Sequence, residues 1–479
     1  MDLLCGVTKR YFAPIVIAVL VMAGPAFAQF YLPGNLVVSV EGNGSGTGSY
    51  GDNQAAPLTL YQYHPNGTTS ASFVNSLELP QTSSGANSAV SGEYGSSSEG
   101  ILQLSGNNEY LTIMGYGINA NTFNANPGAY GPVSTNKALA QSGSLKGQNY
   151  IPVSRVVALI NSHGNVNSTT ALYGVFDQNN PRSAYTLTGK QIYVSGQGNY
   201  PDATGGVFLA NLGANAASVS ITAGDAGSGY SQDTRVVTGY NGQLYVSTDS
   251  KKGSTNRSYV GTLGTGFPTS TVGAPVMLPG FGNTGGTGKY QITTGANSNG
   301  NGLNAGKQIN LSPEQYFFAN SSTMYVTDSG YGKQTSATSA IGDGGLQKWS
   351  LISGNWVLDY TLSAGLNLVE NPNAAPGNTA GTTGLLGLAG KVVGNEVELY
   401  ATNYTIGDLD QTYLLGIADN LSAMLASQVT GESFSILATA PADSNFKGVS
   451  FAPVPEPGTM ALLGSGLMGW LAARRRKAA

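Results

Sequence analysis

The chain is poor in charged residues, histidine and cysteine, and these shortages exclude several kinds of site. Of its 479 residues, 10% are Asp, Glu, Lys or Arg, two are His and one is Cys. Because a zinc site usually takes several His or Cys ligands, this composition argues against one. A single Cys forms no disulfide within the chain, so stability must come from an apolar core and hydrogen bonds, which a chain of this length can supply.

Glycine is abundant instead, and apolar residues are frequent enough to build a core. There are 68 Gly, and 41% of the residues are hydrophobic. The glycines keep no three-residue period, which excludes collagen. The frequent apolar residues and the low net charge exclude a disordered chain. The length allows one large domain or two to three ordinary ones.

The first 28 residues are typical of a secretory signal peptide. Lys9 and Arg10 precede an apolar run over 12–22, and an A-x-A cleavage site follows. Cys5 lies before the apolar run, so cleavage leaves a mature chain without Cys. The alternative is a membrane helix retained at the N-terminus, for which the run is short. The residues at the predicted cleavage site are Ala26, Ala28 and Gln29.

The C-terminus combines a proline-containing motif, an apolar stretch and a basic end. The apolar stretch, 460–473, has 14 residues, fewer than the ~20 that cross a bilayer as a straight helix. The basic end would hold the C-terminus in the cytoplasm while the rest of the chain is exported. The motif residues are Val454, Pro455, Glu456 and Pro457. The basic residues are Arg474, Arg475, Arg476 and Lys477.

This order of parts resembles the PEP-CTERM sorting signal, also known as the ice-binding protein C-terminal motif. The resemblance implies a partner, an exosortase-like membrane enzyme that recognises residues 455–457. It also implies a precursor anchored in the inner membrane of a Gram-negative bacterium that makes exopolysaccharide. Such a precursor loses its apolar helix on the way to the cell surface or the medium. The alternative is a plain C-terminal membrane anchor. We therefore expect a signal peptide over 1–28, a body over 29–453 and a sorting signal over 454–479.

The body repeats one sequence pattern, a polar turn followed by a β-rich segment centred on Tyr. Tyr and β-branched residues alternate with small polar residues in these segments, as in strands, and no sustained helical period occurs outside the two termini. The sequence therefore predicts an all-β body. The repeated segments are 189–195, 241–247 and 321–327, with looser copies at 395–402 and 107–113.

Most copies are followed by two further strand-like pieces, so each unit has four strands, as in a β-propeller blade. A lone strand at 447–451 would join three N-terminal strands and close the ring, which removes the exposed sheet edges. With internal units from about 101, 184, 235, 314 and 384, we predict six four-stranded blades and a short C-terminal apolar helix. Seven blades is the alternative if 80–100 or 282–306 contains strands. A β-helix or a pair of sandwiches is a further alternative. The three N-terminal strands are expected over 36–40, 58–63 and 76–79.

Searches for catalytic motifs are mostly negative. The sequence contains neither a P-loop nor a G-x-S-x-G nucleophile elbow. A G-x-G-x-x-G match at 46–51 lacks the helix that a dinucleotide site needs, and a second match at 464–469 falls in the apolar tail. His64 and His163 both lie in contexts that indicate turns after strands.

Calcium is the one cofactor that the sequence leaves open, because calcium takes oxygen ligands. Four acids follow Tyr-centred strands, and 297–302 has the alternating Asn of a calcium loop but no carboxylate. Without further signals we assign no cofactor and interpret the acids as solvated loop residues. The four acids are Asp249, Asp328, Asp408 and Asp410.

Charge and export together suggest the class of function. Without the two terminal segments, 15 Lys and Arg stand against 23 Asp and Glu, a net charge of −8. This charge disfavours nucleic acid and anionic membrane surfaces, so the membrane is reached only through the C-terminal helix. We expect a surface or matrix protein with a binding or structural role, and extracellular polysaccharide as a possible partner. The alternative is a secreted lyase, hydrolase or lactonase with a calcium or acidic site in the propeller channel.

Overall fold

The body of the computed structural model spans Gln29–Val454. The predicted signal peptide and C-terminal apolar helix lie outside the residues that the structure describes. The described residues are 29–44, 50–96, 98–132, 138–199, 202–223, 233–252, 255–282, 289–291, 308–330, 343–372, 375 and 377–455.

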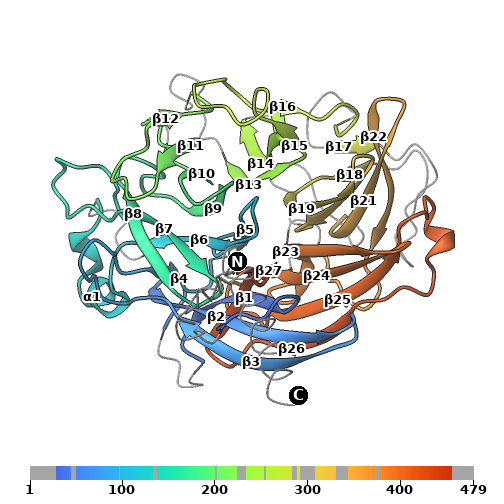
Figure 1. Ribbon diagram of the computed structural model, residues 1–479, viewed down its shortest axis with the longest axis horizontal. Helices are drawn as coiled ribbons and strands as arrows, with labels where there is room; N and C mark the ends of the chain where they lie inside the picture. Colours follow the sequence, from blue (N-terminus) through green and yellow to red (C-terminus); the bar gives the residue numbers. More distant parts are fainter. Residues whose placement is uncertain are drawn as a thin grey trace, which may run out of the picture. The chain divides into compact units, whose positions relative to one another are not determined.

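The body consists of antiparallel β-sheets (Figure 1), which confirms the all-β prediction. Helical structure within the described ranges is limited to one short α-helix, α1 (Ala120–Ala125), and the 3-10 helices Pro127–Ala129 and Ala426–Gln428. Asn119 caps α1 by accepting a hydrogen bond from the Thr122 backbone N–H at 2.9 Å.

Four of the sheets have four antiparallel strands each, in chain order from the first strand outward. They correspond to the units predicted from about 184, 235, 314 and 384. The first sheet has β9 (Pro181–Thr186), β10 (Gln191–Gly196), β11 (Gly206–Asn211) and β12 (Val219–Ser220). The second has β13 (Thr234–Tyr240), β14 (Gln243–Lys252), β15 (Thr255–Thr262) and β16 (Val276–Met277). The third has β19 (Pro313–Asn320), β20 (Thr323–Asp328), β21 (Gly345–Ile352) and β22 (Asn355–Leu362). The fourth has β23 (Thr382–Val393), β24 (Glu396–Thr405), β25 (Tyr413–Asn420) and β26 (Ser435–Thr439).

Nine further strands form a single sheet, where two separate four-stranded units were predicted. A short strand, β4, pairs with the start of β2 and with one residue of β6, and so joins the two units. The N-terminal unit has β1 (Leu36–Gly42), β2 (Ala55–Asn66), β3 (Ser70–Glu78) and, from the C-terminus, β27 (Ser444–Phe451). The other has β5 (Gln103–Leu104), β6 (Tyr110–Tyr116), β7 (Arg155–Asn161) and β8 (Val166–Leu172), and the linking strand β4 is Ser91–Glu93.

The first and last strands of the body pair with each other, as the sequence predicted. β27 runs antiparallel to β1, with Leu36 opposite Phe451 and Gly42 opposite Ser444. The pairing joins residues about 400 positions apart, so it forms only when the rest of the body brings the two ends together. Segments 80–100 and 282–306, which would have to contribute strands to a seventh unit, contain β4 and β17 (Lys289–Gln291), respectively. β17 pairs only with β18 (Gln308–Asn310), so neither segment builds a four-stranded sheet from the described residues.

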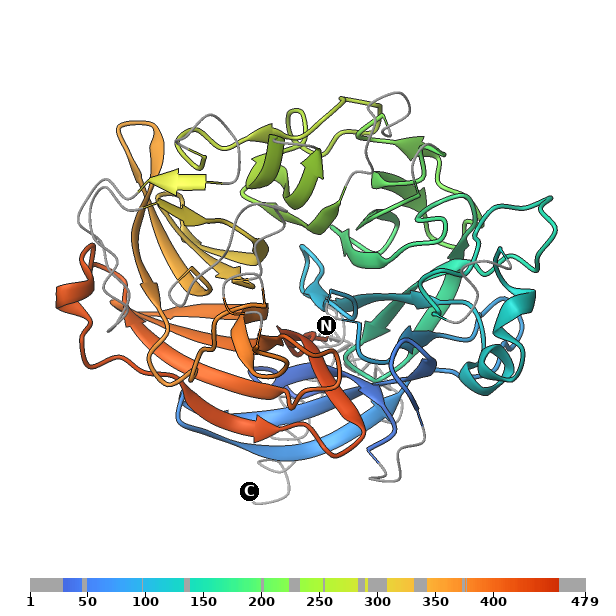
Figure 2. The ribbon, with the colours of Figure 1, turned by 180° about the vertical axis from the view of Figure 1, so that it is seen from behind.

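Neighbouring four-stranded units contact each other through strands at or next to one edge of each unit (Figures 1 and 2). β6 contacts β9, β9 contacts β13, β13 contacts β19, β19 contacts β23, β23 contacts β27, and β27 contacts β5. Apolar side chains fill these contacts. The repeated tyrosines contribute, because Tyr193, Tyr325 and Tyr400 are buried among aliphatic or aromatic neighbours.

A buried hydroxyl on the second strand of each unit joins it to the next unit. In five of the six units this Ser or Thr lies two residues after the repeated Tyr. Each hydroxyl donates to a carbonyl in or beside the first strand of the following unit, and the sixth bond returns to the unit that begins the series. The pairs are Thr112 to Ala184, Ser195 to Arg235, Ser247 to Glu314, Thr327 to Leu386, Thr402 to Lys447 and Ser39 to Gly100.

In four units this hydroxyl also accepts a hydrogen bond from a backbone N–H that a β-bulge in the same sheet leaves outside the regular ladder. Opposite Thr327, for example, two residues of β19, Glu314 and Gln315, face one residue of β20. The Gln315 N–H, which the bulge removes from the regular ladder, donates to Thr327 Oγ1 at 2.9 Å. Bulges at the same place occur opposite Ser39, Ser247 and Thr402, whose hydroxyls accept from Gly448, Val236 and Gly387.

A buried ion-pair network joins the second and third four-stranded sheets. The Arg235 guanidinium, 1% exposed, binds both oxygens of Glu314 at 3.1 Å and lies 3.2 Å from Asp233 and 3.4 Å from Asp249. These carboxylates hold the pKa of Arg235 far above its usual range, although burial alone lowers it. The network therefore neutralises charge inside the body.

Removing one of the linking hydroxyls should destabilise the body. Thr327→Val keeps the shape of the side chain but leaves the Leu386 carbonyl and the Gln315 N–H without their partner. We expect a loss of about 2–4 kcal/mol in the free energy of unfolding, measured by urea denaturation. Thr188→Val, at an exposed turn, is the matched control and should change stability little. Equal stability of both variants would contradict the role assigned to the hydroxyl.

Removing the cation of the ion-pair network should cost more than removing an exposed one. Arg235→Met leaves the buried carboxylates of Glu314 and Asp249 without their cation, while Asp233 keeps Arg182 at 2.9 Å. We expect a loss of about 3–5 kcal/mol or failure to fold. Lys391→Met breaks a pair with Glu398 in which the lysine is 43% exposed, and should cost less than about 1 kcal/mol. Thermal unfolding and soluble yield check both, and a milder effect at Arg235 than at Lys391 would refute the prediction.

Candidate functional site

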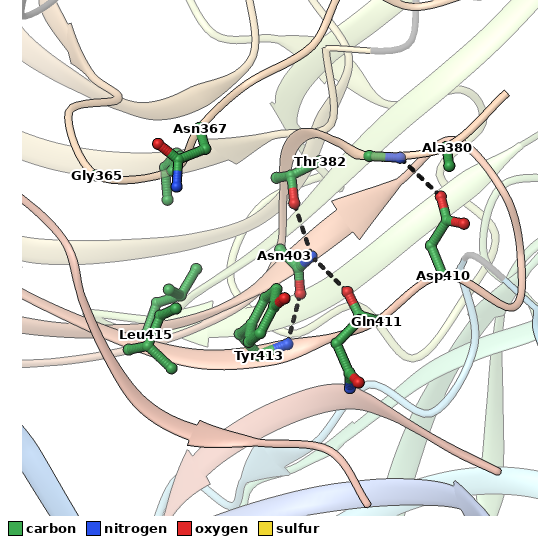
Figure 3. Close-up of a pocket in the computed structure, with 12 residues that line it drawn as sticks. Gly365, Asn367, Ala380, Thr382, Asn403, Asp410, Gln411, Tyr413 and Leu415 are labelled. Atoms are coloured by element: carbon green, nitrogen blue, oxygen red, sulfur yellow. Dashed lines mark hydrogen bonds between the residues drawn. The ribbon is translucent and has the colours of Figure 1, made fainter. Parts of the chain in front are cut away.

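A pocket of about 350 Å³ opens at one end of the fourth four-stranded sheet (Figure 3). Its walls come from the connection between β22 and β23, from the connection between β24 and β25, and from the facing ends of the strands. Polar and apolar side chains both contribute. The side chains that line it include Leu366, Asn367, Thr382, Asn403, Asp410, Gln411, Tyr413, Leu415 and Ile436.

Asn403 at the end of β24 holds the polar wall together. Its Nδ2 donates to Thr382 Oγ1 at 2.9 Å and to the Gln411 carbonyl at 3.3 Å. Its Oδ1 accepts from the Tyr413 backbone N–H at 2.7 Å. Figure 3 shows how this one amide ties β23, β25 and the preceding loop to each other. Asn403 is 2% exposed and its amide is engaged by these hydrogen bonds, so its side chain has a structural role. The side chains around it line the cavity.

Asp410 fixes the mouth of the pocket with one oxygen and leaves the other available. Asp410 Oδ2 accepts from the backbone N–H groups of Gly381 and Gly407, each at 2.9 Å. Within the described part of the chain, no hydrogen bond involves Asp410 Oδ1, the Tyr413 hydroxyl or the Asn367 side chain. These polar groups are therefore available to a molecule in the pocket.

The rest of the lining is apolar. Leu366 and Leu415 form its buried part, and Ile436 is 52% exposed at the rim. Among the described residues of the lining, Asp410 is the one carboxylic acid, and neither Lys nor Arg contributes. A ligand here meets a carboxylate acceptor, a phenol, an amide and an aliphatic surface, the mixture that small-molecule sites use to orient their ligands.

The four acids singled out from the sequence lie in different environments. Asp410 lines the pocket and Asp408 precedes it in the same loop. Asp249 and Asp328 lie in strands and are buried, not solvated as predicted. Asp249 pairs with Arg235 and accepts from Ser312 Oγ at 2.7 Å. Asp328 accepts from the Ser312 and Gly330 N–H groups and from Gln347 Nε2.

These acids do not form a metal centre. Across the residues that the structure describes, no group of three or more His, Cys, Asp or Glu side chains is arranged to hold a metal ion. The physical reason is visible at Asp249 and Asp328, whose oxygens are already engaged by donors of the chain itself. The asparagine-rich segment 297–302 lies outside the described residues.

One of the two predictions about the histidines was wrong. His163 lies in a turn, as predicted. His64 lies inside β2, opposite Ser72 of β3, because the hairpin turn begins only after Asn66. Its Nδ1 is 2.9 Å from Asn35 Oδ1. The G-x-G-x-x-G match at 46–51 falls largely outside the described residues, and the match at 464–469 wholly so.

The sorting-signal residues are only partly described. Val454 and Pro455 are the last described residues, while Glu456, Pro457 and the basic end lie beyond them, as do Ala26 and Ala28 at the other terminus. Gln29 is the first described residue. No helix in the described ranges is long and apolar enough to span a membrane.

Sequence reasoning found one pocket residue, Asp410, and missed the others. Asn403 follows directly after the repeated segment 395–402, and this position offered the one available signal. Thr382, Tyr413 and Ile436 lie on three different strands, and nothing in their local sequence distinguishes them from other strand residues. Only the folded sheet brings them together.

Comparison with known proteins identifies the C-terminal segment but not the body. Residues 453–477 match the PEP-CTERM protein-sorting motif. No curated protein matches the chain. An ACO/RPE65 chimera shares 8% identity over 88% of this chain and 93% of its own, with a TM-score of 0.34. A Synechocystis apocarotenoid oxygenase mutant shares 7% over 88% and 93%, with a TM-score of 0.32. A prolyl endopeptidase shares 10% over 81% of this chain and 41% of its own, with a TM-score of 0.26.

The matched motif carries a conclusion of its own. A PEP-CTERM segment marks an exported protein that is directed to the cell surface and sorted by an exosortase, a membrane enzyme. Residues 453–477 of this chain therefore carry the sorting signal of a secreted, exosortase-sorted protein.

Proposed function

We propose that this protein is a surface-displayed binding protein whose body is a six-bladed β-propeller. Its precursor is anchored in the inner membrane of a Gram-negative bacterium, and an exosortase that recognises residues 455–457 passes it to the cell surface. The observation that carries the proposal is the PEP-CTERM match at 453–477, directly after the last strand of a folded, thiol-free body.

The cyclic series of hydroxyl bonds supports the propeller. Six units of four strands follow one another, and each donates from its second strand to the first strand of the next. The sixth bond, from Ser39 to the Gly100 carbonyl, leads back to the unit of β5–β8, from which Thr112 begins the series. A linear stack of sheets would leave the first and last units without this partner. Pairing of β27 with β1 completes one blade from both ends of the body.

The pocket of the fourth sheet supports a binding role for extracellular carbohydrate. Sugars present hydroxyl groups that donate and accept hydrogen bonds, together with apolar C–H faces. Asp410 Oδ1, the Tyr413 hydroxyl and the Asn367 amide can bind such hydroxyls, while Leu415 and Ile436 supply apolar contact. Because the lining has a carboxylate and no cation, the ligand is a neutral sugar unit rather than a uronate or a sulfated sugar. The net charge of the body, −8, also disfavours anionic sugars.

The sorting part of the proposal is tested by changing the recognition motif. Replacing residues 455–457 by Ala should keep the body in the inner membrane fraction, as should deletion of the sorting enzyme. The unmodified protein should move to the surface or the medium. Fractionation with an antibody against the body measures both. If the body has the same distribution with and without the enzyme, the sorting function is wrong.

The binding part is tested at the available carboxylate of the pocket. Asp410→Asn retains an oxygen that can accept from Gly381 and Gly407 but removes the charge and replaces the second acceptor oxygen by an NH2 donor. We expect the affinity for neutral oligosaccharides to fall at least tenfold, about 1.4 kcal/mol, measured by calorimetry after a screen on neutral and uronate-containing glycans. Glu396→Gln, an exposed carboxylate at the opposite end of the same sheet, is the matched control. Binding of uronates only, or equal affinity of both variants, would contradict the assignment.

A further inference from the structure

The sorting tail leaves the body at one defined face. After β27 ends at Phe451, the Ala452 N–H donates to the Asn35 carbonyl and the Val454 N–H donates to the Asn108 carbonyl, both at 2.8 Å. The chain is therefore held against the body up to one residue before Pro455. The recognition motif starts at that point, on the surface around the turn between β5 and β6.

Other turns of the body lie at the same face. The β5–β6 turn bonds to the end of β9, because the Gly106 N–H donates to Thr186 at 2.9 Å and the Asn107 N–H donates to Leu187 at 3.0 Å. The turns β5–β6, β9–β10 and β13–β14 also line one pocket of about 370 Å³. We call this surface, comprising residues 105–109, 187–190 and 240–243, the turn face.

The Asp410 pocket lies at the other end of β27. At the start of this strand, Asn445 Nδ2 donates to the Asp408 carbonyl at 3.1 Å, and the Phe446 N–H donates to Thr412 Oγ1 at 2.7 Å. Both acceptors belong to the loop that forms the pocket mouth. β27 has eight residues, so roughly 26 Å of extended strand separates the pocket loop from the exit of the tail.

The link between the body and the apolar stretch is shorter than this strand. Residues 455–459 lie between Val454 and Met460, and five fully extended residues span at most about 17 Å. A body tethered this closely at its turn face has the tethered face nearest the membrane. The pocket, at the far end of the strand, cannot reach the bilayer through so short a link while the turn face remains beside its anchor.

We propose that the turn face is the surface turned toward the inner membrane that anchors the tail, and that the Asp410 pocket points away from this membrane. The occupant beside the turn face is the bilayer, from which the sorting enzyme reaches a motif that begins next to Asn108. The carbohydrate pocket is then open to ligand while the precursor is still anchored. This inference depends on the sorting function proposed above, but not on the identity of the ligand.

Single thiols test the orientation, because the mature chain is expected to contain no cysteine. In a Cys5→Ser background, Thr188→Cys introduces a thiol on the turn face and Ala380→Cys introduces one beside the pocket; both positions are exposed. The full-length precursors are accumulated in cells that lack the sorting enzyme. Spheroplasts are then labelled with a maleimide carrying a 5-kDa polyethylene glycol, before and after release of the protein by a mild detergent.

We expect the thiol at position 380 to react equally fast in both states. The thiol at position 188 should react at least fivefold more slowly in the membrane and recover in detergent. A ten-residue Gly-Ser insertion after Val454 should remove this protection, because it lengthens the tether beyond the strand. Equal rates at both positions, or protection at position 380 alone, would overturn the orientation. Absence of the body from the membrane fraction would instead refute the proposed sorting function, so the two failures are distinguishable.

Discussion

The buried hydroxyl that links each unit to the next is the interaction on which the rest of the body depends. Thr327 illustrates it: one oxygen accepts from the bulged Gln315 N–H of its own sheet and donates to Leu386 of the following sheet. Without the hydroxyl, the bulge would leave polar backbone groups unpaired inside the protein, at a cost of about 1–3 kcal/mol each. In the four units that have it, the bulge therefore requires the hydroxyl, and the hydroxyl sets the place where neighbouring sheets meet.

The pocket follows from this constraint. Thr402, the linking hydroxyl of β24, is followed at once by Asn403, which crosses to Thr382 and to Tyr413 and opens the end of the sheet. The same register holds β27 against β23, so the strand that precedes the sorting motif starts beside the pocket loop and ends at the turn face. The pocket loop and the exit of the tail thus lie at the two ends of one strand.

The sequence predicted the all-β class, four of the sheets and the pairing of the terminal strands, because alternation and turn residues are local signals. It also located the Tyr-centred segments, but not the reason for them, since the acceptor of each hydroxyl lies in another unit. Asp249 and Asp328 were interpreted as solvated acids because nothing near them in sequence shows Arg235 or Ser312. His64 was placed in a turn because the extra length of β2 depends on its pairing with β3.

What the sequence by itself determined is the address of the protein and the kind of body that it carries. The predicted signal peptide and the matched PEP-CTERM segment are contiguous motifs, which need no fold to be recognised. Only the tertiary structure decided which groups share a pocket, which charges neutralise each other and which face the tail leaves. Those properties come from residues such as Thr382, Asn403 and Asp410, which meet only after the strands have paired.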